Sequence, residues 1–369
     1  MNQNSPLILI GVGTAGCNIA RGVSRAFGED LRYVLADTDA ASGIAGGPFV
    51  LMGGDRLSGR GAGGDIVSAR LAAEESIQTL NEHIEGVRLA VIVTALGGGT
   101  GAGVTLEAVK HLTACGIPAI VFATTPFAFE GADRQRNARG LMSMIEDAAS
   151  ATFFLPLDKL VQGEDNMDSA MRRAIDTVAT GVTLFWRLIE RPGYIRLDAE
   201  RIRHLIAGAG RGRFAAVSAQ GPNRATEAID RITRAELLAT GSSPIRTILC
   251  GILAGNDLRL MEVGQIADGL RTTFGERIPF ELGTVNDETT FSGRLSIVIM
   301  LFEENAGERG NGSSDSQTPA KRHRSAKNRN PLSVGPTGRG LFNNAEPTSW
   351  NGEDLDIPTF VRRNINLEF

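Results

Sequence analysis

Hydrophobic residues in the first third of the chain fall into short runs separated by polar and glycine-rich stretches. The runs at 7–10, 33–36, 89–94 and 117–124 predict buried β-strands, the second of them ending at Asp37. Helical spacing of apolar residues predicts helices up to about residue 27, over 66–84 and over 104–115. Strands that alternate with helices predict a mostly parallel sheet, so the first ~190 residues should form an α/β domain.

A longer helical pattern begins at Met167 and stops at Pro192-Gly193. Its apolar positions recur every three or four residues, at Met171, Ile175, Val178, Val182, Phe185 and Ile189. This spacing predicts a long helix that faces the core. Further helices over 226–238 and 262–274, with strands over 247–254, 280–282 and 295–302, predict a second, smaller α/β domain.

The composition changes near residue 305. Residues 305–350 are rich in Gly, Ser, Asn and Pro and carry no apolar period, which predicts a disordered linker. Its basic cluster at 321–329 could touch anionic lipid or nucleic acid, although a solvated linker explains it equally simply. Apolar residues return in EDLDIPTFVRR at 353–363.

Bulk properties exclude several classes of protein. The chain of 369 residues has a net charge of −4, which argues weakly against a nucleic-acid-binding body. Its three cysteines and four histidines are scattered, so neither a disulfide framework nor a metal site is indicated. No signal-like start and no apolar run of ~18 residues is present, so we expect a cytoplasmic protein without a transmembrane segment.

Three glycine-rich loops, at 11–16, 59–64 and 97–103, stand out in the first domain. Glycine allows positive φ and a close approach of the backbone to a ligand, and successive N–H groups before a helix form a cradle for anions. A tight strand-to-helix turn is the simpler explanation of a glycine pair. The loop 97–103, with five glycines and one threonine in seven positions, favours a phosphate cradle.

The first loop alone suggests a different function. Gly11, Gly13 and Gly16 satisfy G-x-G-x-x-G after a strand, and Asp37 follows about twenty residues on, which is the dinucleotide fingerprint of NAD-dependent enzymes. A Rossmann half uses one such loop, however, whereas three convergent loops suit a triphosphate better. The sequence GxxxxGK[ST] of ordinary P-loop enzymes is missing.

Two of the loops and four further motifs carry a resemblance to a known family. They are IGVGTAGCN at 10–18, LGGGTGAG at 96–103, TTPFAFEGADR at 124–134, LPLDKL at 155–160, AGNDLRLMEV at 254–263 and the terminal EDLDIPTFVRR. Together they resemble the tubulin/FtsZ superfamily, and the bacterial FtsZ cell-division GTPases in particular, over about residues 5–304 and the tail. The resemblance implies a Rossmann-like GTP-binding domain at 1–167, a central core helix at 168–192 and a C-terminal α/β domain at 193–304.

The resemblance also implies a site for GTP or GDP together with Mg²⁺. Phosphates and part of the nucleoside would be held by Gly13, Thr14, Ala15, Gly16, Cys17, Asn18, Gly61, Ala62, Gly63, Gly97, Gly98, Gly99, Thr100, Gly101 and Gly103. Glu130 and Arg134 would contact the ribose, although a local ion pair would also explain them. Asp176 would read guanine, whose N1–H and amino group suit a carboxylate, and Arg172 would stack on the base in place of an aromatic residue. A plain surface charge remains the alternative for Asp176.

Hydrolysis in this family is completed by a neighbouring subunit, through a loop of pattern NxDxxD. The matching segment near 192–202 keeps Asp198 but carries Arg196 and Arg201 at the other two positions, with Glu200 adjacent. The catalytic candidates are therefore Asp198, Arg196 and Glu200. Arg196 could offset transition-state charge, or the two arginines could clamp the triphosphate and leave a GTP-binding scaffold with little hydrolysis.

Two more positions depart from the family pattern. Asp37 replaces an Asn, and a carboxylate near polyphosphate is unfavourable unless it faces magnesium-bound water. Leu157 replaces the Asn of IPNDKL and removes one polar contact with the base.

The expected partners follow from the same resemblance. The chain would bind itself head to tail in a cytokinetic filament on the inner face of the membrane, and nucleic acid is an unlikely partner. The tail at 351–369 would dock on membrane-tethering or regulatory division proteins through Asp356, Ile357, Pro358, Phe360, Val361 and Arg362. A merely adhesive terminus is the alternative.

Overall fold

The computed structural model describes residues 5–28, 30–161, 166–191, 193–239 and 243–304, together with the short strands at 349–350 and 353–354. The chain divides into two compact units, Met1–Gly312 and Ser313–Phe369. In the second unit β11 (Ser349–Trp350) pairs antiparallel with β12 (Glu353–Asp354), so the predicted linker contains at least one short strand. The other linker residues and the six predicted docking residues at 356–362 lie outside the described residues.

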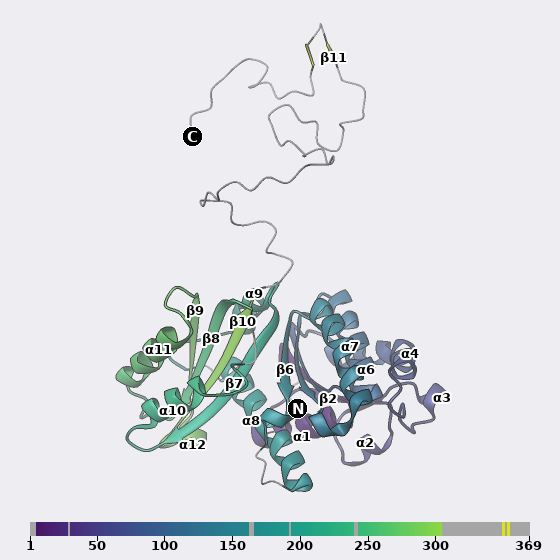
Figure 1. Cartoon of the computed structure of the whole chain (residues 1–369), viewed down its shortest axis with the longest axis horizontal. Helices are drawn as coiled ribbons and strands as arrows, with labels where there is room; N and C mark the ends of the chain where they lie inside the picture. The colour runs from purple at the N-terminus through teal and green to yellow at the C-terminus, as the bar shows by residue number, and fades with distance from the viewer. Residues whose placement is uncertain are drawn as a thin grey trace, which may run out of the picture. The chain divides into compact units, whose positions relative to one another are not determined.

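A single ten-stranded sheet runs through the first unit (Figure 1). Its strands are β1 (Leu7–Val12), β2 (Tyr33–Asp37), β3 (Phe49–Leu51), β4 (Leu89–Ala95), β5 (Ala119–Thr125), β6 (Ala151–Pro156), β7 (Gly210–Gln220), β8 (Ile245–Ala254), β9 (Phe280–Asn286) and β10 (Arg294–Glu303). The order is β3-β2-β1-β4-β5-β6-β7-β10-β8-β9. The first seven are parallel, β10 is antiparallel to both its neighbours, and β8 and β9 are parallel. The mostly parallel α/β fold is confirmed.

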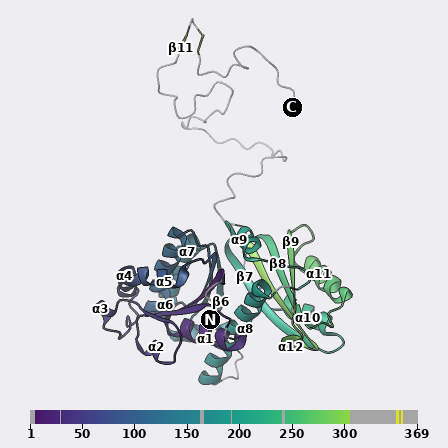
Figure 2. The same ribbon diagram turned by 180° about the vertical axis from the view of Figure 1, so that it is seen from behind.

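Helices cover both faces of this sheet, as Figure 2 shows from behind. The α-helices are α1 (Gly13–Phe27), α2 (Ala41–Ile44), α3 (Gly54–Leu57), α4 (Ile66–Ser76), α5 (Asn81–Ile84), α6 (Gly99–Ala114), α7 (Ala132–Ala148), α8 (Met167–Glu190), α9 (Ala199–Ile206), α10 (Arg224–Thr233), α11 (Leu260–Phe274) and α12 (Glu288–Phe291). Three 3₁₀ turns are η1 (Ile77–Leu80), η2 (Ala128–Glu130) and η3 (Leu157–Lys159). One core packs α1 and α8 against the parallel strands, a second packs α4, α6 and α7 against the opposite face, and a third lies under α10 and α11.

The central helix α8 joins the two halves of the sheet through aromatic packing. Phe122 of β5 stacks on Phe153 of β6 at 5.1 Å between ring centroids and meets Phe214 of β7 edge-on at 4.8 Å. Phe185 of α8 packs on the same ring at 6.1 Å. Because β6 also pairs directly with β7, no break in the sheet marks a boundary, and the division into two domains stays a prediction.

The helix pattern at 167–190 is confirmed except at its start. Val178, Val182 and Phe185 are buried, whereas Met171 is 37% exposed. The first turns of α8 extend past the edge of the sheet, so apolar spacing there finds no core to pack against.

Several elements were not predicted, among them α7, α9, β6 and β7, and the start of one helix was predicted too far along the chain. α7 has only Ala138, Leu141 and Ile145 buried among charged residues, and α9 is short and polar. β6 was seen only as the motif LPLDKL, and β7 begins with GRGR, so neither showed a clear strand pattern. α6 begins at Gly99 rather than at residue 104, because its first turn is built from the glycines themselves. The expected helix at 66–84 is three consecutive pieces, α4, η1 and α5.

Glycines in two of the loops allow backbone to lie on backbone. A Cβ on Gly16 would lie 2.3 Å from the carbonyl oxygen of Val93, and one on Gly101 would lie 2.1 Å from that of Ala95. Both carbonyls belong to β4, so the starts of α1 and α6 sit directly on this strand. Tight packing, the simpler explanation, therefore accounts for several of the glycines.

Replacing Gly16 with alanine should lower the free energy of unfolding by about 1–3 kcal/mol, since the added methyl group clashes with a strand carbonyl that cannot move. Denaturant unfolding without nucleotide measures this loss. Gly140→Ala is the matched control, because a Cβ there meets nothing within 4 Å in α7, and it should raise stability by up to about 1 kcal/mol. Equal stability of the two variants would contradict the packing role.

Candidate functional site

The candidate site lies at the edge where parallel strands β1, β2, β4 and β5 end. α1 begins at Gly13 directly after β1, and α6 begins at Gly99 soon after β4. The two loops are in backbone contact, because a Cβ on Gly13 (φ 73°) would lie 3.1 Å from the amide nitrogen of Gly101. Two helix N-termini therefore share one edge, where both dipoles favour an anion.

The third glycine loop joins this edge. The amide of Gly61 donates to the carbonyl oxygen of Thr38 at 3.1 Å, which ties the loop to the end of β2. A Cβ on Gly99 would lie 2.7 Å from the carbonyl oxygen of Asp65. The Asp65 carboxylate caps α4 by accepting from the amide of Val67 at 3.0 Å. The structure thus brings together the three loops that the sequence singled out.

The predicted phosphate residues differ in exposure. The exposed or half-exposed ones are Thr14, Ala15, Asn18, Gly61, Ala62, Gly63, Gly98 and Thr100. The buried ones are Gly13, Gly16, Cys17, Gly97, Gly99, Gly101 and Gly103. Burial raises the pKa of the Cys17 thiol to about 12, and its Sγ lies 3.6 Å from the carbonyl oxygen of Gly11. Cys17 is therefore part of the floor of the site.

Asp37 lies beneath these loops with a 1% exposed side chain. Its Oδ2 accepts hydrogen bonds from Thr14 Oγ1 at 3.1 Å and Ser42 Oγ at 2.5 Å, and its Oδ1 accepts from the Thr38 amide at 2.8 Å. Thr38 Oγ1 in turn lies 2.5 Å from Thr100 Oγ1. This network connects the loop at 11–16 with the loop at 97–103. Sequence reasoning noted Asp37 but missed Thr38 and Ser42.

A pocket of about 630 Å³ lies between α1, α8 and the segment 45–47. It is lined by Asn18, Arg21, Ser24, Arg25, Tyr33, Ala45, Gly46, Gly47, Arg172, Ile175 and Asp176. Three of these, Asn18, Arg172 and Asp176, were predicted to hold the nucleoside. Asp176 is an exposed carboxylate, and Arg172 pairs with Asp168 one turn earlier.

Among the lining residues that sequence reasoning missed, Arg21 and Tyr33 contribute most to the shape of this pocket. Arg21 donates from Nε to the carbonyl oxygen of Gly46 at 3.2 Å and holds the segment 45–47 against α1. Tyr33 is half-buried and is the one aromatic side chain among these lining residues. Its position at the start of a predicted strand gave no functional signal, because aromatic residues are common in strands.

Glu130 and Arg134 form the local ion pair that was the alternative to ribose binding. Arg134 NH1 lies 2.5 Å from Glu130 Oε2, and Glu130 Oε1 accepts from the amide of Phe127 at 2.9 Å. Glu130 thus closes its own 3₁₀ turn, and its contact with a ribose stays a prediction. Leu157, at the start of η3, is buried.

The catalytic candidates lie elsewhere. Asp198 caps α9 by accepting from the amide of Arg201 at 2.8 Å, and the side chain of Arg201 pairs with Glu281 of β9. Arg196 is exposed and makes no ion pair with the residues that the structure describes. Glu200 pairs with Arg88 at 3.1 Å and with Arg203 at 3.0 Å.

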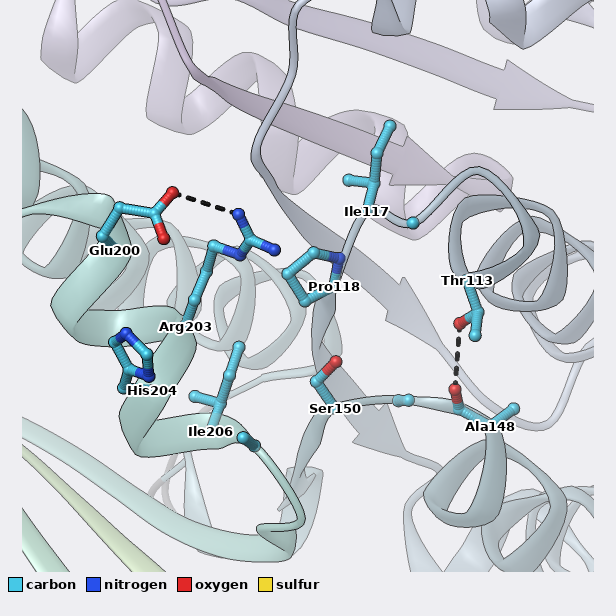
Figure 3. A pocket seen from close by; sticks show the side chains of 12 residues that line it. Thr113, Ile117, Pro118, Ala148, Ser150, Glu200, Arg203, His204 and Ile206 are labelled. Carbon is cyan, nitrogen blue, oxygen red and sulfur yellow. Dashed lines mark hydrogen bonds and ion pairs between the residues drawn. The ribbon is translucent and has the colours of Figure 1, made fainter.

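Figure 3 shows Arg203 of α9, paired with Glu200, beside Pro118 in a pocket of about 450 Å³ that His204 also lines. Arg88 and Pro118 immediately precede β4 and β5, so this pocket is at the amino-terminal edge of the strands. The three glycine loops are at the carboxyl-terminal edge, and seven-residue strands separate the two edges by about 20 Å. Within one chain the structure therefore does not bring Asp198, Arg196 and Glu200 to the phosphate loops.

The described residues contain no group of three or more potential metal-binding side chains and no helix long and apolar enough to cross a bilayer.

Comparison with known proteins identifies the family. Residues 6–164 match the family described as "Tubulin/FtsZ family, GTPase domain", a range that holds all three glycine loops. The cell division protein FtsZ of Pseudomonas putida is 31% identical over 77% of this chain and 73% of its own length. FtsZ of Pseudomonas aeruginosa is 28% identical over 98% of this chain and 97% of its own length.

Solved structures share the fold. The structure "FtsZ dimer, empty (M. jannaschii)" superposes with a TM-score of 0.75 at 22% identity, covering 80% of this chain and 87% of that one. CetZ2 from Haloferax volcanii, solved as a GTPγS-bound protofilament, gives a TM-score of 0.67 at 23% identity over 80% and 92% of the two chains. With the shared loops and the sequence identity, these likenesses show that the chain belongs to the tubulin/FtsZ family, as a divergent FtsZ-like member.

Proposed function

We propose that this protein binds GTP and polymerises head to tail as a cytoskeletal filament of bacterial cell division. One observation carries the proposal: the glycine loops and the Asp198 loop lie at opposite edges of one sheet. A complete hydrolytic site then requires the carboxyl-terminal edge of one subunit and the amino-terminal edge of the next. Such a heterologous contact does not close on itself and generates open filaments.

The geometry of the three loops supports triphosphate binding. Backbone amides at the starts of α1 and α6 would hold the phosphates, and Asp176 would read guanine in the 630 Å³ pocket. Arg60 is the only cationic side chain within the three loops. Since one arginine cannot balance a triphosphate, Mg²⁺ fits here as the ion that neutralises the bound phosphates.

Asp198 is the residue that we propose to orient the attacking water in the neighbouring subunit's site. Its exposed carboxylate has one oxygen engaged by the amide of Arg201, which fixes its direction at the start of α9. The side chain of Arg201 pairs with Glu281, whereas that of Arg196 is exposed to solvent.

A GTP-binding filament scaffold with little hydrolysis is the second candidate function. It is favoured by the exposed Arg196, which lies near Asp198, the one carboxylate that the family pattern retains here. A cation at this position can stabilise the bound triphosphate in its ground state and so slow its hydrolysis. In either case we propose that the filament acts at the division site on the inner face of the membrane. Its terminal peptide would dock there on tethering or regulatory division proteins.

Asp176→Ala should weaken GTP binding about 10- to 100-fold and abolish the preference for GTP over ATP, because two charge-assisted hydrogen bonds to guanine are lost. Equilibrium titration with fluorescent GTP and competing ATP measures both effects. Asp230→Ala, on the distant helix α10, removes a similar exposed carboxylate and should change neither. Wild-type selectivity in Asp176→Ala would refute the assigned base pocket.

Mixing two variants, at a GTP concentration well below the Kd of Asp176→Ala so that neither is active alone, tests completion of the site between subunits. Asp198→Ala keeps an intact nucleotide edge, and Asp176→Ala keeps an intact Asp198 edge. In an equal mixture about a quarter of head-to-tail junctions combine both intact edges, so phosphate release should recover to about a quarter of the wild-type rate. Light scattering recorded in parallel reports assembly.

Each other result has a defined meaning. A mixture no more active than its components would contradict completion in trans. Unchanged turnover in Asp198→Ala alone would show that this loop does no chemistry, and assembly without turnover in the wild type would support the scaffold.

A further inference from the structure

The buried carboxylate of Asp37 determines which way two neighbouring hydroxyl groups point. Thr14 Oγ1 and Ser42 Oγ both lie within hydrogen-bond distance of Asp37 Oδ2, at 3.1 and 2.5 Å. Ser42 Oγ also lies 3.4 Å from Thr14 Oγ1, but it is much closer to Asp37 Oδ2. An ionised carboxylate can only accept hydrogen bonds, so both hydroxyl hydrogens point inward toward it. The remaining lone pairs of Thr14, which is exposed on the first turn of α1, then face the candidate phosphate site.

Lone pairs facing outward have a chemical consequence. A phosphate oxygen also only accepts, so it gains nothing from a Thr14 hydroxyl whose hydrogen is engaged by Asp37. A divalent cation can be coordinated by the outward lone pairs of Thr14 Oγ1, and a water molecule bound to that cation can donate a hydrogen bond to them. The orientation therefore favours a nucleotide that arrives with its cation over a bare triphosphate.

The charge of Asp37 acts in the same direction. Among the residues that the structure describes, Asp37 has no salt bridge, and it is stabilised by the amides of Thr38 and Asp39 at 2.8 and 3.3 Å. The nearby Arg21 bonds instead to the carbonyl oxygens of Ser42 and Gly46. A buried negative charge so close to a triphosphate repels it unless a cation intervenes.

We propose that Asp37 is a positioning residue that makes nucleotide binding depend on a divalent cation. It acts through Thr14 and through its charge, without touching the nucleotide itself. This inference rests on the proposed function, because it requires the triphosphate to bind at the three loops. A purely structural role, in which Asp37 only caps the segment 38–42, would produce no such dependence.

The test compares nucleotide affinity with and without Mg²⁺. Fluorescent GTP is titrated into the full-length protein in excess Mg²⁺ and in EDTA, and the ratio of the two Kd values measures the dependence. In Asp37→Asn the amide nitrogen takes the place of Oδ2, donates to both hydroxyls and removes the charge. We expect the ratio to fall about tenfold, chiefly through tighter binding in EDTA.

Asp39→Asn is the matched control. It removes the same charge from the same segment, and its side chain accepts from the amide of Ala41 at 2.9 Å without a bond to Thr14. Its Kd ratio should stay near the wild-type value. An unchanged ratio in Asp37→Asn, or an equal fall in Asp39→Asn, would overturn the proposal.

Thr14→Val keeps the inference testable if Asp37→Asn does not fold. Removing the hydroxyl deletes the outward lone pairs, so this variant should bind less tightly in Mg²⁺ while its affinity in EDTA stays the same or rises. Wild-type affinity in both conditions would contradict the role of Thr14. Failure of the wild-type protein to bind GTP in Mg²⁺ would instead refute the proposed function itself.

Discussion

The whole arrangement depends on close backbone contact between two helix starts and one strand. Gly16 lies against the carbonyl of Val93, Gly101 lies against that of Ala95, and Gly13 meets the amide of Gly101. No side chain fits in these three contacts, so α1, β4 and α6 form one rigid block. Because of this contact both helix N-termini open onto the same edge, and a shared anion site is possible only there.

Much of this edge could be predicted from sequence, because glycine density and strand-to-helix order both survive as local signals. What could not be predicted is how the glycines divide their roles. Gly16 and Gly101 serve packing, whereas Gly98 is exposed and a Cβ there meets nothing within 4 Å. Whether a glycine packs against β4 or stays exposed depends on where the folded strand lies beneath the loops. Likewise α7 is hidden in sequence, since few of its residues are buried on the sheet.

The polar part of the site was harder to predict than its glycines. Asp37 stood out as a departure from the family pattern, but its partners Thr14, Thr38 and Ser42 are ordinary residues whose hydrogen bonds depend on three separate loops. Arg21 and Tyr33 were missed for the same reason: their position in the pocket results from the segment 45–47 folding back on α1. Tertiary contacts, rather than residue type, give these side chains their role.

The position of Asp198 is likewise set by both halves of the molecule. Glu200, two residues after Asp198, pairs with Arg88 next to β4. Arg201, three residues after Asp198, pairs with Glu281 of β9. Both pairs are partly exposed and contribute little stability alone, but they pull α9 toward opposite halves of the sheet. Arg201, a departure from the family pattern, thereby gains a structural role in place of the carboxylate it replaces. A movement of the β4 half of the sheet relative to the β9 half would therefore also move Asp198. The geometry of the amino-terminal edge is in this way coupled to the conformation of the whole subunit.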